Sequence, residues 1–379
     1  MSGYKLIEQP VQLEKLCRQL ATVQELALDL EADSLHHYRE KVCLVQISDR
    51  THTWLIDPLQ VSDLSPLALL FADPERLVVL HGGDYDIRSL HRDFGITVGR
   101  MFDTMVGAQF CGMGEFGLAA LLREQFSIEL DKRFQKADWS RRPLTPEMAD
   151  YAAHDTAHLL QLADLLQEKL QQLGRLDWVA EECSLLVNNR VSDKGDGPLF
   201  MNCKGAGKLR PRNLAVLEAL LQLRDGLARE LDRPPFKVMP SEALLKVAEQ
   251  LPKAVRDMNQ IPGLTPRLLS RYGDQLLEAV RQALETPELQ LPRYPRGKGE
   301  PNPGIKARLA LLKAWREQVS SRLELATGLL SPNWLLERIA EQQPETLKQL
   351  TEIPGIRRWQ LRLWGEEMIE TLTKERQTV

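Results

Sequence analysis

The C-terminal half of this 379-residue chain repeats itself at a constant offset of 92 positions. Leu217 of the first copy corresponds to Leu309 of the second, and Ile261-Pro262-Gly263 corresponds to Ile353-Pro354-Gly355. The correspondence runs without a gap over about 55 residues, and apolar residues in each copy recur at helical spacing. A repeat of this kind is one supersecondary unit per copy. The duplication therefore predicts two small all-α bundles.

Two stretches rich in glycine and proline separate the bundles from each other and from the rest of the chain. They span residues 193–212 and 291–304, and both lose apolar periodicity. Clusters of Gly and Pro interrupt helices and strands and are typical of linkers. We therefore expect a first domain at 1–192 and bundles at 213–290 and 305–379.

The first domain mixes strand-like and helical patterns. Apolar runs bounded by turn residues predict strands at 26–31, 42–48, 53–56 and 77–81. Helical spacing predicts helices at 12–20, 64–70, 86–94, 117–125 and 146–173. Strands that then alternate with helices indicate an α/β domain with a mixed central sheet. Thr145 and Pro146 supply a cap and a first-turn proline to the last helix.

Four carboxylates of this domain fall in register. Asp29 and Glu31 alternate with apolar residues in a predicted strand, so both project from one face. Tyr151 and Asp155 are one helical turn apart and share a face of the last helix. Asp86 lies where a strand gives way to a helix, at an edge where α/β sites assemble. Such oxygen ligands suit two divalent cations, Mg²⁺ or Mn²⁺.

The composition is that of a soluble globular protein. No apolar run approaches the roughly 20 residues that a membrane helix needs. The five cysteines are odd in number and widely spaced, so neither a disulfide framework nor a thiolate zinc site is expected. Residues 1–192 carry 19 Lys and Arg against 29 Asp and Glu, which leaves the C-terminal half basic and able to attract a polyanion. We expect a cytoplasmic protein without a membrane partner.

Three motifs in the first domain resemble those of the DEDD superfamily of 3′→5′ exonucleases. Leu28-Asp29-Leu30-Glu31 matches the motif Exo I, and residues 81–87 match Exo II. Residues 151–155 match Exo III in its Tyr-x-x-x-Asp form, which marks the DEDDy branch. Phe102-Asp103-Thr104 is also typical of the ribonuclease D-like branch, and the two repeats resemble HRDC domains. The architecture is most similar to that of bacterial ribonuclease D, which implies a ribonuclease H-like mixed sheet followed by two HRDC bundles.

The resemblance implies a role for each matched residue. Asp29, Glu31 and Asp155 would hold a first divalent cation, Asp29 would bridge to a second, and Asp86 would support the second. Tyr151 would orient the attacking water. The implied reaction is hydrolysis of the 3′-terminal phosphodiester of RNA with release of nucleoside 5′-monophosphates. The implied substrates are tRNA precursors and other structured RNA 3′ ends, bound by a monomer that needs no stable protein partner.

Two residues compete for the role of the Exo II ligand. Asp86 has the family spacing from His81, whereas Asp84 could instead cap the helix that follows. We favour Asp86. His81 is itself a candidate for substrate contact.

The basic and aromatic cluster near the end of the chain has two interpretations. Arg357, Arg358 and Arg362 lie beside Trp359 and Trp364, a mixture that suits contact with the RNA backbone and base stacking. Alternatively, this bundle docks on the exonuclease domain and Trp364 belongs to the core.

The motifs also leave open a DNA exonuclease or a catalytically weak RNA-binding scaffold, although all five catalytic positions are intact.

Overall fold

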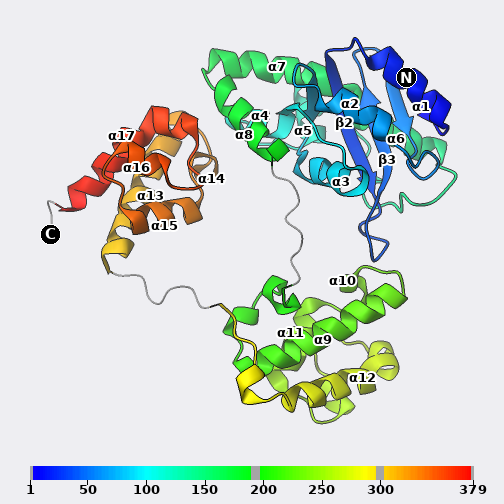
Figure 1. Cartoon of the computed structure of the whole chain (residues 1–379), viewed down its shortest axis with the longest axis vertical. Helices are drawn as coiled ribbons and strands as arrows, with labels where there is room; N and C mark the ends of the chain where they lie inside the picture. Colours follow the sequence, from blue (N-terminus) through cyan, green and yellow to red (C-terminus); the bar gives the residue numbers. More distant parts are fainter. Residues whose placement is uncertain (1–2, 189–196, 296–302, 377–379) are drawn as a thin grey trace. The chain divides into compact units, whose positions relative to one another are not determined.

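A computed structural model describes residues 3–188, 197–295 and 303–376, which form two compact units (Figure 1). The first unit contains the described residues of 3–32, 42–188 and 303–376, and the second contains those of 33–41 and 197–295. Residues 189–196 and 296–302, which include parts of both predicted linkers, lie outside the described residues.

The first unit is built on a six-stranded sheet with the order β1-β4-β3-β2-β5-β6. Its strands are β1 Tyr4–Ile7, β2 Glu25–Ala32, β3 Val42–Ser48, β4 Thr53–Ile56, β5 Leu77–Leu80 and β6 Arg100–Asp103. Strand β3 runs antiparallel to β2 and β4, whereas β1 pairs with β4, β2 with β5, and β5 with β6 in parallel. The predicted mixed sheet is confirmed, and its two edge strands, β1 and β6, are additional to the prediction.

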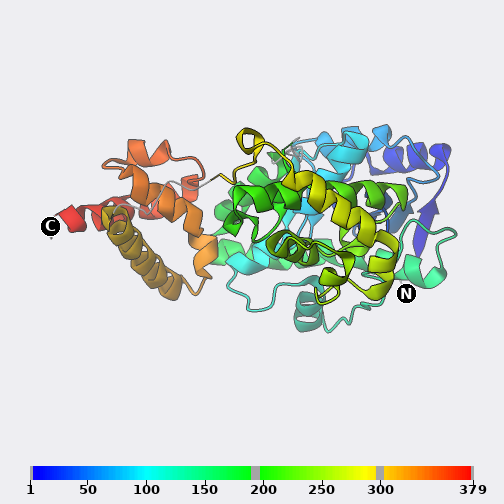
Figure 2. The ribbon, with the colours of Figure 1, turned by 90° about the horizontal axis from the view of Figure 1, so that it is seen from below.

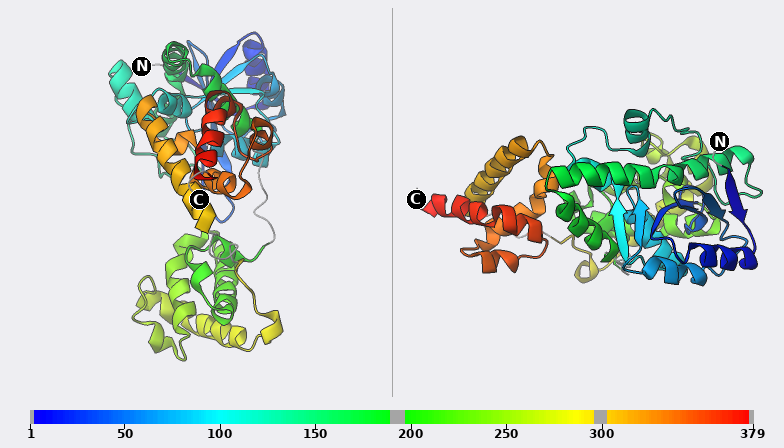
Figure 3. Two further views of the ribbon diagram at one scale, coloured as in Figure 1. Left: turned by 90° about the vertical axis from the view of Figure 1, so that its left-hand side faces the viewer. Right: turned by 90° about the horizontal axis from the view of Figure 1, so that it is seen from above.

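Eight helices accompany the sheet in the described residues of the first domain. They are α1 Pro10–Leu20, α2 Ser65–Ala72, α3 Asp84–Phe94, α4 Thr104–Phe110, α5 Leu118–Phe126, α6 Pro146–Ala157, α7 Leu159–Gln172 and α8 Leu176–Asn188. Helices α6 and α7 lie along one face of the sheet, as the right-hand view of Figure 3 shows. The single helix predicted over 146–173 is interrupted at His158, whose φ of −116° and ψ of 2° depart from helical values. Helix α6 contacts β2, β3 and β4, whereas α7 contacts β2 and β5.

The two repeats fold into bundles whose helices correspond at the 92-residue offset. The first contains α9 Pro211–Glu230, α10 Pro235–Val238, α11 Ser241–Gln250 and α12 Pro266–Leu284. The second contains α13 Pro303–Leu323, α14 Thr327–Leu330, α15 Asn333–Gln342, α16 Leu347–Thr351 and α17 Arg358–Arg376, and is drawn in orange to red in Figure 2. Both are all-α in their described residues, as predicted.

The duplication extends to individual side-chain contacts. Arg224 donates to the carbonyl of Met239 and to Ser241 Oγ. Its counterpart Arg316 donates to the Ser331 carbonyl and to Asn333 Oδ1. Ser331 and Asn333 are the equivalents of Met239 and Ser241 at the 92-residue offset. An arginine that bridges the first helix and the loop before the third is therefore a structural feature of each copy.

Residues 199–208, which fall in the predicted first linker, are folded onto the first bundle. They form two short 3₁₀ turns, Leu199–Asn202 and Ala206–Lys208, and bury the side chains of Phe200, Cys203 and Ala206 in its core. The glycines that suggested a linker instead permit tight turns, since Gly205 has a φ of +95°.

The second bundle shares a hydrophobic core with the first domain. Trp178 of α8 stacks on Trp359 of α17 with ring centroids 4.9 Å apart and planes 7° apart. Trp364, which is 4% exposed, packs edge-on against both rings. Of the two interpretations of Trp364, the core position is therefore correct.

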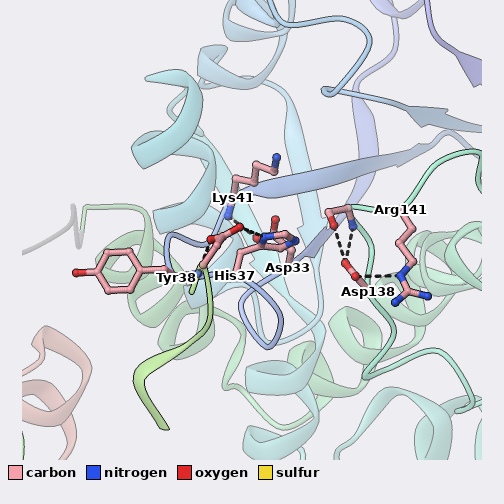
Figure 4. Close-up of polar contacts among 8 residues, drawn as sticks. Asp33, His37, Tyr38, Lys41, Asp138 and Arg141 are labelled. Carbon is pink, nitrogen blue, oxygen red and sulfur yellow. Dashed lines mark hydrogen bonds and ion pairs between the residues drawn. The ribbon is translucent and has the colours of Figure 1, made fainter. Parts of the chain in front are cut away.

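The loop that joins β2 to β3 belongs to the second unit. Asp33 accepts a hydrogen bond from the Lys41 backbone N–H at 2.8 Å and closes the loop (Figure 4). The Tyr38 hydroxyl lies 2.8 Å from Asp225 of α9, and His37 Nδ1 lies 2.7 Å from Asp232. These contacts fasten the loop to the first bundle.

A search of the described helices found no span with the length and apolar character needed to cross a bilayer.

Candidate active site

Strand β2 carries the two Exo I carboxylates on one face of the sheet. Its apolar alternates Leu28 and Leu30 are buried in the core on the opposite face. The side chains of Asp29 and Glu31 are left on the face that α6 covers. A register shift between Glu31 and Ala32 ends the regular pairing with β3 just beyond the site.

Helix α6 brings Tyr151 and Asp155 to the same place. Thr145 caps the helix by accepting a hydrogen bond from the Met148 N–H, and Pro146 occupies the first turn, as predicted. The hydroxyl of Thr156 lies 2.7 Å from Ser48 Oγ on β3, which fixes the helix on the sheet one residue after Asp155. The rotation of α6 is therefore set by a cap at its start and by a contact with the sheet directly after Asp155.

Three carboxylates converge into one oxygen cluster. Ligand atoms of Asp29, Glu31 and Asp155 all lie within 4.8 Å of one another. They line a cavity of about 650 Å³ together with Tyr151 and His81. A cavity of this volume accommodates a nucleotide-sized ligand.

Burial and mutual repulsion disfavour the charged forms of these acids. Burial raises the pKa of the Asp29 carboxyl to about 7 and that of Asp155 to about 8, and in Asp155 the charge of Asp29 adds to the rise. The pKa values of Glu31 and Asp86 are raised well above their ordinary range, first by burial and then by the neighbouring carboxylates. A divalent cation offsets the repulsion among these ionised carboxylates, so the donor set fits a metal.

Asp86 stands next to this cluster, and Asp84 does not. Asp86 is 8% exposed. The charge of Asp86 raises the pKa of Glu31, and the charge of Asp29 raises the pKa of Asp86. Asp86 is not among the three residues within 4.8 Å. Asp84 is the first residue of α3, after the cap residue Gly83, and pairs with Arg88 at 2.6 Å. The placement supports Asp86 as the Exo II residue.

Tyr151 is held by aromatic rings of the segment that precedes α6. The rings of Phe134 and Trp139 lie 5.8 and 6.0 Å from the Tyr151 ring. Asp138 stiffens this segment by accepting hydrogen bonds from Ser140 and Arg141 (Figure 4). Burial and the charges of nearby acids raise the pKa of Tyr151, so its phenol is neutral.

A buried amide lies across from Asp29. Gln46 is the cross-strand partner of Asp29 in the β2–β3 register and therefore shares its face. The residue is 0% exposed, and neither side-chain polar atom has a hydrogen-bond partner among the described residues. An unpaired buried amide costs stability, which is common at functional sites.

The arginines predicted to contact RNA have partners in the first domain. Arg357 Nε donates to Glu182 at 2.8 Å, and Arg362 pairs with Asp177. Arg358 has an exposed side chain, and its backbone N–H donates to Glu181. Contact between these arginines and RNA stays a prediction. The ion pair of Arg357 with Glu182 shows that this arginine helps to dock the second bundle on α8.

Two residues that sequence reasoning left without a role organise the Exo II turn. The Asp103 carboxylate accepts hydrogen bonds from the N–H groups of Gly82 and Gly83, both at 2.9 Å, and caps α4. The Thr104 hydroxyl donates to the Leu80 carbonyl at 3.0 Å. An Asp followed by a Thr after an apolar strand is a helix-cap signal that could have indicated the first of these roles.

Known proteins match both halves of the chain. A family model described as 3′-5′ exonuclease matches residues 4–171, and one described as HRDC domain matches residues 213–280 and 305–372. Ribonuclease D of Pseudomonas paraeruginosa is 31% identical over 369 residues, which cover 97% of this chain and 96% of that protein. This chain belongs to the ribonuclease D family. Ribonuclease D of Escherichia coli is 30% identical over 87% of this chain and 88% of that protein.

Solved structures agree with this membership. The crystal structure of Escherichia coli RNase D, described as an exoribonuclease involved in structured RNA processing, has a TM-score of 0.76 and 28% identity, and the match covers 98% of this chain and 99% of that one. The catalytic core of RRP6 from Trypanosoma brucei has a TM-score of 0.65 and 30% identity over 75% of this chain and 80% of that one. As a ribonuclease D family member with this site, the chain is a 3′→5′ exoribonuclease.

Proposed function

We propose that the chain removes nucleotides from RNA 3′ ends with two divalent cations, Mg²⁺ or Mn²⁺, held by Asp29, Glu31, Asp86 and Asp155. The convergence of Asp29, Glu31 and Asp155 oxygens within 4.8 Å carries this proposal, because a divalent cation offsets the repulsion between ionised carboxylates this close. Bound cations would lower the pKa of a water and offset charge on the scissile phosphate.

The phenol of Tyr151 acts on the attacking water by hydrogen bonding. Its raised pKa makes it a poor base, because a neutral phenol holds its proton throughout the physiological range. It can still accept a hydrogen bond from water or donate one to it. The packing of Phe134 and Trp139 against the ring restricts that geometry to a narrow range. Tyr151 is therefore an orienting group.

The opposite wall of the cavity suits the substrate phosphates. Leu118, Ala119 and Ala120, in the first turn of α5, line the cavity, and no side chain caps this helix. Uncapped N–H groups at a helix N-terminus attract anions. Lys132 adds a positive charge, and Phe116, which is 39% exposed, offers a ring on which a base can stack.

The substrates we propose are tRNA precursors with extra 3′ residues and other structured RNA 3′ ends. The Escherichia coli relative is described as an exoribonuclease of structured RNA processing, and this chain retains the same domain order. The products would be nucleoside 5′-monophosphates. We further propose that the chain acts as a monomer in the cytoplasm, where its five cysteines stay reduced.

A single assay tests this function. Purified protein is incubated with 3′-labelled tRNA precursor or matched single-stranded DNA, in Mg²⁺, Mn²⁺ or EDTA. We expect mononucleotide release from RNA only with a cation, and none from Asp29→Asn. Asp84→Asn, which removes a neighbouring carboxylate outside the cluster, is the control and should retain activity. Equal release in EDTA, or by Asp29→Asn, would contradict the metal site, and preferential release from DNA would contradict the substrate.

A further inference from the structure

His81 lies in the wall of the catalytic cavity with one ring nitrogen bound to Thr104. Its Nδ1 is 2.9 Å from Thr104 Oγ1, and that hydroxyl donates its hydrogen to the Leu80 carbonyl at 3.0 Å. A carbonyl oxygen only accepts, and a threonine hydroxyl has a single hydrogen. The hydroxyl must therefore accept from His81, so Nδ1 carries the ring proton.

The other nitrogen of His81 is then an acceptor. A neutral imidazole has one N–H and one bare nitrogen, so Nε2 offers a lone pair. Burial lowers the pKa of His81 even though the charge of Asp103 opposes this effect, which favours the neutral ring. Nε2 has no hydrogen-bond partner within the parts of the chain that the structure describes, and the side chain borders the cavity.

The surroundings hold His81 in this state. Thr104 is 0% exposed, so its hydroxyl cannot turn to water. The preceding residue, Asp103, holds the backbone of Gly82 and Gly83 directly after His81. Two consecutive side chains thus fix both the backbone and the tautomer of one cavity residue.

The chemistry of the cavity indicates what Nε2 binds. His81 is not part of the oxygen cluster of Asp29, Glu31 and Asp155, so it does not share their cation. Substrate phosphate oxygens cannot donate a hydrogen bond, whereas ribose hydroxyls can. A base N–H differs between nucleotides, but a ribose hydroxyl is present on every RNA unit that an exonuclease must remove.

We infer that His81 Nε2 accepts a hydrogen bond from a ribose hydroxyl of the 3′-terminal nucleotide, and that Thr104 is the positioning residue that sets the tautomer. This inference rests on the proposed action on RNA 3′ ends. Thr104 itself does not touch the substrate. The contact would couple recognition of the sugar to the Exo II turn that also carries Asp86.

The test is a double-mutant cycle between the protein and the substrate. Oligoribonucleotides that end in a ribo, a 2′-deoxy or a 3′-deoxy nucleotide are cleaved by the wild type and by His81→Phe, which keeps a ring but removes the acceptor. In the wild type, loss of the recognised hydroxyl should lower kcat/KM about tenfold, the value of one hydrogen bond. In His81→Phe the same loss should have no further effect, and the two deoxy ends tell which hydroxyl is bound.

Thr104 variants test the positioning role. Thr104→Val keeps the shape of the side chain but removes the hydroxyl, so it should reduce discrimination between ribo and deoxy ends. Thr104→Ser keeps the hydroxyl and should discriminate as the wild type does. Nitrogen-15 NMR of labelled histidine should show the Nδ1–H tautomer in the wild type and a shift toward Nε2–H in Thr104→Val.

The outcomes separate this inference from the proposed function. A wild type that releases no nucleotide from any RNA overturns the proposed function and this inference with it. A wild type that cleaves RNA, together with equal discrimination in His81→Phe, overturns the inference alone. If NMR shows that His81 of the wild type carries its proton on Nε2, the inference is overturned without any activity measurement.

Discussion

Removal of the Asp29 charge should stabilise the metal-free protein while it abolishes cation binding. Burial raises the pKa of this carboxyl from an ordinary value of 3.8 to about 7. A difference of about three units corresponds to roughly 4 kcal/mol of cost for the ionised form in the folded state. The carboxyl borders a cavity that admits water, so we take about half of this, roughly 2 kcal/mol. For a unit of this size that is a rise in Tm of about 4–8 °C.

The sign follows from the direction of the shift. An acid whose folded-state pKa is raised keeps its proton in the folded protein over a range where the unfolded chain has lost it. Its contribution to the free energy of unfolding therefore falls as the pH rises from about 4 to about 7 and stays low above that range. The gain from Asp29→Asn should be nearly complete at pH 8.5 and smaller at pH 5.

Thermal unfolding in EDTA measures this effect, and a second series with Mg²⁺ measures binding. The wild type should gain stability when Mg²⁺ is added at pH 8.5, whereas Asp29→Asn should not. Asp84→Asn is the matched control, because it removes a partly exposed carboxylate paired with Arg88 and should change stability by less than about 1 kcal/mol. If Asp29→Asn melts no higher than the wild type at pH 8.5 in EDTA, or if Asp84→Asn gains as much, the reasoning from carboxylate repulsion is refuted.

Three further predictions concern Tyr151, Gln46 and Arg362. Tyr151→Phe should lower kcat about 100-fold or more with little change in the Mg²⁺-induced Tm shift, since it removes only the hydroxyl on the attacking water; a loss of the shift would contradict this. Gln46→Met should raise the free energy of urea unfolding by about 1–3 kcal/mol, because it removes an unpaired buried amide; a decrease would show that the amide is paired. Arg362→Ala should change stability by less than about 1 kcal/mol, because its pair with Asp177 is exposed, and weaker RNA binding by filter assay would support RNA contact.

Local signals explain which parts of the fold were predictable. The alternation around Asp29 predicted β2, and the cap at Thr145 predicted the start of α6, because both signals lie within a few residues of the feature they specify. The edge strands β1 and β6 have only four residues each, too few for periodicity to show. They are strands because β4 and β5 supply partners for their backbone groups.

Contacts distant in sequence account for what was missed at the site. The bond from Asp103 to the Gly82 N–H spans 21 residues and exists because β5 and β6 pair in parallel, so that their ends meet. The ion pair between Arg357 and Glu182 spans 175 residues. No residue pattern near either partner could indicate such a contact, whereas the spacing of the Exo motifs indicated the carboxylates directly.

The two repeats differ at the residues that begin their last long helix. In the first copy Thr265 caps α12 with its own side chain, by accepting from the Leu268 N–H. The equivalent residue of the second copy is Arg357, which cannot accept a hydrogen bond with its side chain.

The cap that the second copy lacks comes from the exonuclease domain. The carboxylate of Glu181 on α8 accepts hydrogen bonds from the N–H groups of Arg358 and Trp359 at the start of α17. Trp359, which stacks on Trp178, takes the place that Arg267 has in the first copy. Helix α8 also supports the Exo II turn, since Cys183 Sγ accepts from the Asp103 N–H. Divergence at a helix N-terminus has therefore made the second repeat a structural part of the catalytic unit, while the first retains a cap and a core of its own.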